Sequence, residues 1–194
     1  MHIKPILTAA WFTPLAVGGM VLAIGGGLVL HIIPNKVLMI ISCSGFVLSV
    51  LFFAIIPDPA TSDKSTSFIY WAYIFPAMIC GTIGVDITFN VTNVFITTAM
   101  PRRHQAAAGG LINSLLYLGI AFWLGVAELA ISATVETRGG HDNVADREQY
   151  QIGFWTGLGL AIASLALVLT IKMGSAEASM TADEKAELEQ RQLQ

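Results

Sequence analysis

The chain has 194 residues, of which 55% are hydrophobic and only 12% charged, with a formal net charge of −3 at pH 7. A soluble globular domain carries about 25% charged residues, so the composition argues against a soluble protein and for one that lies in lipid. No basic stretch indicates a nucleic-acid partner, and the expected partner is the lipid bilayer.

The first two predicted helices lie at residues 6–33 and 37–56, neither of which contains Asp, Glu, Lys or Arg. Each stretch is long enough to cross about 30 Å of hydrocarbon. The first stretch is rich in glycine, and Gly19, Ala23 and Gly27 form a row of small residues. Such a row allows a neighbouring helix to approach closely.

Three further apolar segments follow, at 68–99, 106–134 and 152–171. The first of these is about 50 Å long as a straight helix, so it must tilt, bend at Pro76 or project beyond the bilayer. We therefore expect residues 1–173 to form an all-α, polytopic membrane bundle of about five transmembrane helices. Residues 174–194 are expected to form a cytoplasmic tail.

The third predicted span carries a stripe of polar residues at steps of four, four, three and four: Thr82, Asp86, Asn90, Asn93 and Thr97. That spacing puts all five on one face of an α-helix. In the next span, Asn113 and Tyr117 lie four residues apart and also share a face. Facing polar groups inside two long apolar helices predict half of a pathway for a small polar or amphipathic molecule.

Asp86 is the strongest functional candidate in this stripe. It lies 18 residues after Phe68 and 15 before Pro101, near the middle of its helix. An ionisable group inside a span costs about 2.5–3.5 kcal/mol on insertion scales and usually marks a functional position. The alternative is that Asp86 lies near an interface or caps a broken helix. The three asparagines either line a substrate cavity or hydrogen-bond between helices.

Other polar residues are secondary candidates for the pathway: Thr82, Thr97 and Glu128, the last near enough to a helix end to reach water. The hinge between the third and fourth spans contains three basic residues that serve either as a topology signal or as a gate: Arg102, Arg103 and His104. We expect no metal and no cofactor. The spans contain no HExxH, GxSxG or paired catalytic acids, which argues against an intramembrane enzyme.

The central part of the chain has a recognisable order of motifs. A glycine-flanked acid and a phenylalanine are followed by a proline, a hinge ending in His-Gln, a run of small residues, Leu-Ile-Asn and a glycine-rich helix. These are Gly84, Asp86, Phe89, Pro101, His104-Gln105, Ala106 to Gly110, Leu111 to Asn113 and Gly119 to Gly125. The order resembles the fourteen-span fungal drug:proton antiporters of the major facilitator superfamily, of the aminotriazole-resistance type. Ala106 stands where that family usually has glycine.

The resemblance implies an incomplete C-terminal half of a major facilitator fold, which begins at the second helix of that half. Transport would then need the missing N-terminal half, because alternating access rocks two halves about a site between them. The first hypothesis is a fragment of a transporter that exports a small organic solute or drug in exchange for protons. The alternative is a small non-transporting membrane protein that assembles through glycine-rich helix faces. A purely structural bundle has no need for Asp86 inside a helix.

Five spans place the two termini on opposite sides of the membrane. The distribution of Lys and Arg favours the N-terminus outside and the C-terminus in the cytoplasm, with the plasma membrane as the expected location. Reporter tags at positions 62 and 142 should therefore be accessible to an impermeant reagent on intact cells, and a tag at position 104 should not. Labelling of the tag at 104 would reject the orientation and the alignment to the family.

Overall fold

The computed structural model describes residues 11–29, 33–58, 65–139, 146–171 and 190–191. Within these ranges the chain consists of helices and short connections, and it contains no strand. The predicted all-α membrane bundle is confirmed. The tail expected at 174–194 lies almost wholly outside the described residues.

The described helices overlap the predicted spans. They are α2 (Thr13–Val29), α3 (Asn35–Ala54), α4 (Thr66–Ile69), the π-helix η1 (Tyr70–Ile74), α5 (Phe75–Ala99), α6 (Arg102–Thr137) and α7 (Asp146–Thr170). The elements α4, η1 and α5 follow one another without a break, so they form the single long helix predicted for the third span.

Prolines explain where several of these helices begin or change. Pro34 and Pro101 each precede the first helical residue, at the starts of α3 and α6. Met100, the residue before Pro101, is extended, with φ −109° and ψ 141°, because the proline ring disfavours the helical conformation there. Pro76 lacks the N–H needed for a helical bond to the preceding turn, and η1 ends two residues before it.

Four of the described helical segments are long and apolar enough to cross a membrane: Asn35–Ala54, Ser67–Ile96, Arg102–Thr137 and Arg147–Thr170. The described part of the first predicted span, α2, has 17 residues, or roughly 25 Å of helix. It is thus slightly short of a full crossing. Length and composition place the chain in the membrane as an integral protein.

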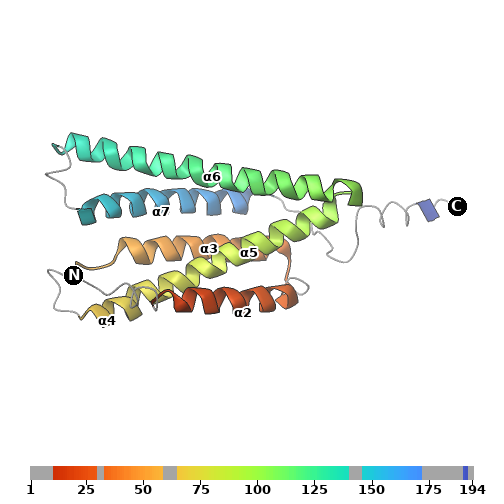
Figure 1. Cartoon of the computed structure of the whole chain (residues 1–194), viewed down its shortest axis with the longest axis horizontal. Coiled ribbons are helices and arrows are strands. Elements are labelled where there is room, and N and C mark those ends of the chain that lie inside the picture. Colours follow the sequence, from red (N-terminus) through yellow and green to blue (C-terminus); the bar gives the residue numbers. More distant parts are fainter. Residues whose placement is uncertain (1–10, 30–32, 59–64, 140–145, 172–189, 192–194) are drawn as a thin grey trace.

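The helices lie side by side in the order α2, α5, α3, α7 and α6 (Figure 1). The centre is α3, which packs against α5 on one side and α7 on the other. In Figure 1, α5 runs obliquely across α3, whereas α6 and α7 run alongside each other at the top of the view. The helix α6 packs against α7, extends beyond it, and has only a small contact with α5.

The contact between α3 and α5 is the tightest in the described chain. A Cβ atom added at Gly45 of α3 would lie 2.8 Å from the backbone oxygen of Cys80 and 3.3 Å from the backbone nitrogen of Gly84. The fully buried Ser42 hydroxyl donates to the backbone oxygen of Gly84 at 2.6 Å and also hydrogen-bonds Thr88. Small residues therefore bring the two backbones together, and a buried hydroxyl fixes their register.

The helix α6 differs from the other long helices in how little of it is covered. Val135, near its end, is its only buried residue, and large apolar side chains such as Leu111, Leu118 and Phe122 are more than 60% exposed. A helix that is apolar on all sides fits a membrane span or the interior of a larger protein. The surroundings of α6 are therefore lipid or further helices.

Candidate functional site

The candidate site is centred on Asp86, on the side of α5 that faces α2. Its Oδ2 atom is buried and has no hydrogen-bond partner among the described residues. A Cβ atom added at Gly19 of α2 would lie 3.7 Å from this oxygen. Asp86 as a residue is half-buried, but a single buried polar atom without a partner is already costly, so this oxygen calls for a functional explanation.

Thr82, one turn before Asp86, is buried and belongs to the same contact. Its hydroxyl donates to the backbone oxygen of Met78 at 2.8 Å, so it satisfies its own helix. Its methyl group lies 3.8 Å from a Cβ atom added at Gly18 and 3.9 Å from one added at Gly19. Thr82 is thus part of the wall around Asp86.

The stripe continues from Asp86 along α5, as the spacing predicts. Asn90 and Asn93 are half-buried, and the Asn93 side chain donates to the backbone oxygen of Phe89 at 2.9 Å. Thr97 lies within α5, but its side chain is outside the part of the chain that the structure describes. Their role in a substrate or proton pathway remains a prediction.

The polar residues of α6 are not gathered around Asp86. The Asn113 side chain donates to the backbone oxygen of Gly109 in its own helix at 3.0 Å, and Tyr117 is 70% exposed. Glu128, near the other end of α6, is also exposed. The polar stripe of α5 is therefore the one polar wall that the described residues form around Asp86. Asn113, Tyr117 and Glu128 are exposed and meet no other polar group of the described bundle outside their own helix.

The basic hinge is exposed at the start of α6. Arg102, Arg103 and His104 occupy its first turn, directly after Pro101. The side chain of Gln105 donates to the backbone oxygen of Met100 at 3.3 Å, which ties the two sides of the hinge together. Whether the basic residues set the topology or act as a gate remains a prediction.

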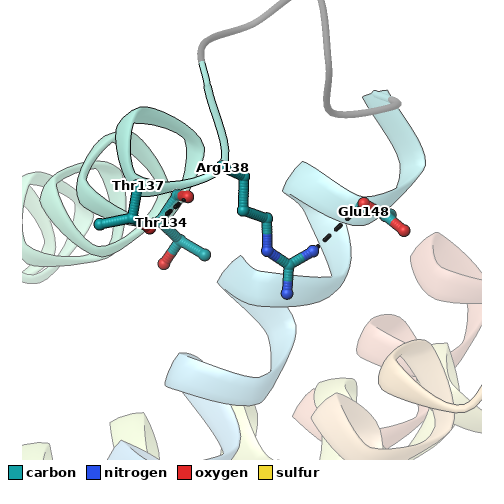
Figure 2. A network of polar contacts seen from close by, with 4 residues as sticks. All are labelled: Thr134, Thr137, Arg138 and Glu148. Atoms are coloured by element: carbon teal, nitrogen blue, oxygen red, sulfur yellow. Dashed lines mark hydrogen bonds and ion pairs between the residues drawn. The ribbon is translucent and has the colours of Figure 1, made fainter.

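The opposite end of the bundle holds ion pairs between helix ends. Arg138 lies 3.3 Å from Glu148, across the connection between α6 and α7, as Figure 2 shows. Arg147 donates to the backbone oxygen of Ile56 at 2.8 Å and lies 3.8 Å from Asp58. Exposed pairs of this kind contribute about 1 kcal/mol or less each, so they orient the helix ends more than they stabilise the fold.

Sequence reasoning did not associate two parts of this arrangement with the candidate site. Gly18 and Gly19 form the α2 side of the Asp86 contact, and Thr88 hydrogen-bonds Ser42 across α3 and α5. The small-residue row on α2 was a usable indication, because it predicts close approach by some other helix. It did not indicate which helix. The described residues contain no cluster of His, Cys, Asp or Glu that would hold a metal ion.

The chain is similar in sequence to several fungal transporters. It is 27% identical over 157 residues to a low affinity ammonium transporter of Saccharomyces cerevisiae, which covers 81% of this chain and 28% of the relative. It is 26% identical over 184 residues to the efflux pump terJ of Aspergillus terreus, covering 95% and 33%. It is 28% identical over 151 residues to the major facilitator superfamily multidrug transporter mdr3 of Aspergillus fumigatus, covering 78% and 26%.

These relatives confirm the resemblance to fungal major facilitator transporters, and an aminotriazole resistance protein is also among them. The chain is thus related to a family of membrane transporters. It spans about a third or less of the length of the relatives described above. No family profile and no solved structure matches the chain significantly.

Proposed function

We propose that the chain is part of a secondary transporter that exports a small organic solute in exchange for protons, with Asp86 as the proton-exchanging group. The observation that carries this proposal is the buried, unpartnered Oδ2 of Asp86 in the middle of a membrane-length helix. Ionisable side chains in such positions usually serve ion or substrate pathways. The relatives are named as transporters and efflux pumps rather than enzymes, which supports the same class of function.

The solute and the direction of transport belong to this proposal. The names of the relatives mention ammonium, multidrug transport and efflux, which supports a small solute. A carboxyl group beside half-buried asparagines suits a proton or a protonated amine, because Asp86 is the only charged residue of α5. The plasma membrane, with the N-terminus outside, is the location that fits export.

The proposal includes a partner that completes the pathway. Asn113 and Tyr117 are exposed on α6, and the apolar surface of that helix is uncovered within the described chain. Alternating access needs two halves about a central site. We therefore propose that an N-terminal half, on the same or another polypeptide, supplies the opposite wall.

The chain expressed alone in a drug-sensitive yeast should confer no resistance, because one incomplete half leaves its polar face without an opposite wall. Co-expression with an N-terminal half from a fungal relative should produce resistance and lower the intracellular drug concentration. The measurement is growth on drug, with drug efflux from preloaded cells. Resistance from the chain alone would show that oligomers supply the missing wall and would overturn the partial-transporter proposal.

The second candidate function is assembly without transport, and one observation favours it. A Cβ added at four glycines of α6 would meet no atom of the described residues within 4 Å: Gly109, Gly110, Gly119 and Gly125. In contrast, Gly45, Gly81 and Gly84 are in close contact between α3 and α5. Uncovered small residues are available to a neighbouring helix. Assembly alone leaves the buried Oδ2 of Asp86 unexplained, so transport remains the better proposal.

A further inference from the structure

The contact between α2 and α5 is centred on the two adjacent glycines of α2. A Cβ atom added at Gly18 would lie 3.7 Å from Cδ1 of Ile79 and 3.8 Å from the methyl group of Thr82. The equivalent atom at Gly19 would lie 3.7 Å from Oδ2 of Asp86. Three successive turns of α5 therefore meet α2 at the point where α2 has no side chains.

This contact explains why the Asp86 oxygen is buried. Large side chains of α2 such as Met20, Val21 and Ile24 are 63–72% exposed and so point away from α5. The bare backbone at the glycines lets α2 lie directly over the carboxyl group, which leaves no water-accessible surface at Oδ2. In this arrangement one of the two carboxyl oxygens has neither water nor a hydrogen-bond partner, which is costly for a polar atom.

No opposite charge on the neighbouring helices offsets this burial. The helix α2 contains no ionisable residue, and α5 contains only Cys80 besides Asp86. On α3, which packs against the same helix, the ionisable residues are Lys36 and Cys43. Lys36 lies at the helix start and donates to the backbone oxygen of Leu169 at 3.5 Å, and Cys43 faces Ser164 of α7 at 3.9 Å.

The helix α2 is also placed so that it can leave α5 without unpacking the rest of the bundle. Its main neighbour among the described helices is α5, whereas α3 is held between α5 and α7. Just before α2 begins, the Trp11 ring stacks on Tyr70 with centroids 5.1 Å apart, and the Trp11 backbone oxygen accepts a hydrogen bond from the Tyr70 hydroxyl at 2.8 Å. These contacts tie the chain just before α2 to the π-helix η1.

We propose that Gly19 is a positioning residue of the Asp86 site: α2 covers the Oδ2 face of the half-buried carboxyl group at Gly19, and must separate from α5 there before water reaches that face. The inference rests on the proposed function, since it takes Asp86 as the proton-exchanging group. It adds a second helix to the site and a named contact that controls access of water to the carboxyl group.

The distances define a graded test. An added Cβ at 3.7 Å from Oδ2 is in ordinary van der Waals contact, so Gly19→Ala should leave α2 in place. A leucine side chain has no room between the two helices and should hold them apart. Gly25→Leu is the matched control, because Gly25 lies on the same helix and no atom of the described residues is within 4 Å of a Cβ added there.

The experiment measures how readily water reaches Asp86 in the full chain, purified in mild detergent. A water-soluble carbodiimide modifies accessible carboxyl groups, and mass spectrometry of the peptide that contains Asp86 gives the rate at that residue. The Gly19→Leu variant should be modified at least about tenfold faster than the parent. This corresponds to a change of about 1.4 kcal/mol in the free energy for separating α2 from α5. The Gly19→Ala and Gly25→Leu variants should match the parent, and Asp86→Asn gives the blank.

A second variant keeps the proposal falsifiable if the leucine variant does not fold, as judged by circular dichroism. Thr82→Ala removes the methyl group packed against both glycines and adds no bulk, so it should also speed modification of Asp86, by a smaller factor. Equal rates in the parent and in the folded variants would overturn the proposal, as would equal acceleration by Gly25→Leu. The test involves no transport, so its failure is distinct from failure of the proposed function.

Discussion

We expect Asp86→Asn to abolish proton-coupled export while leaving the protein in the membrane at the parent level. The amide keeps the size and much of the hydrogen-bonding capacity of the acid, but it does not titrate. Since Oδ2 of Asp86 is buried beside α2 without a partner, the substitution introduces no clash with a neighbouring charge. The loss should therefore appear in coupling to protons and not in folding.

The measurement uses the transporter completed with an N-terminal half, in membrane vesicles with an imposed proton gradient. Drug movement is followed between about pH 5 and 8, the range in which a group poised for exchange changes its charge. Glu136→Gln is the matched control, because it removes a carboxyl group from the exposed last turn of α6. It should transport as the parent does.

Asp86→Glu separates titration from shape. It restores an ionisable group, so some proton-coupled export should return. The longer side chain has little room beside α2, because even a Cβ atom added at Gly19 would be in van der Waals contact with the aspartate oxygen. If the asparagine variant exports as well as the parent across the whole pH range, Asp86 is a structural residue and the assignment of the site is wrong.

The sequence was sufficient to predict the helices because lipid imposes simple requirements on them. A run of about 20 uncharged, apolar residues has to be helical in a membrane, since the backbone finds no water to bond. The starts of α3 and α6 follow from Pro34 and Pro101.

The neighbours of each helix could not be predicted in the same way. Nearly every face of these helices is apolar, so periodicity does not identify the side that packs against protein. The central place of α3 depends on Ser42, Gly45 and Ser49 meeting small residues of α5, far along the sequence. Sequence analysis recognised a row of such residues on α2, but the matching positions are set by helix crossing and register.

In the candidate site, too, the sequence predicts positions along one helix but not contacts between helices. The spacing of the stripe places Asp86, Asn90 and Asn93 along α5, and the structure describes all three there. The approach of Gly19 to Asp86 joins residues distant in sequence, and no local pattern indicates it. Asn113 and Tyr117 share a helix face with each other, but they are exposed, since the described chain supplies no wall opposite them.

The second large effect is expected at the contact between α3 and α5, where Gly45→Ala should destabilise the protein by about 1–3 kcal/mol. The added methyl group would lie 2.8 Å from the backbone oxygen of Cys80 and 3.3 Å from the backbone nitrogen of Gly84. Backbone atoms inside a helix have no rotamer to change, so the two helices must move apart. That movement stretches the 2.6 Å hydrogen bond that the fully buried Ser42 hydroxyl donates to the backbone oxygen of Gly84.

Two other glycines supply the comparison. A methyl group at Gly84 would lie 3.0 Å from the ring of Phe46, and that side chain has some freedom to rotate, so Gly84→Ala should cost less than Gly45→Ala. Gly119→Ala meets nothing within 4 Å and should be neutral or slightly stabilising, because alanine favours a helix over glycine.

Unfolding of the three purified variants in mild detergent, titrated with a denaturing detergent and followed by circular dichroism, gives the order of stability. The order expected from the distances is Gly45→Ala least stable, Gly84→Ala intermediate and Gly119→Ala most stable. If Gly45→Ala unfolds at the same point as Gly119→Ala, then α3 and α5 do not meet at Gly45. The arrangement that holds Asp86 between α2 and the rest of the bundle would then lose its central support, because α5 is fixed to the bundle chiefly through α3.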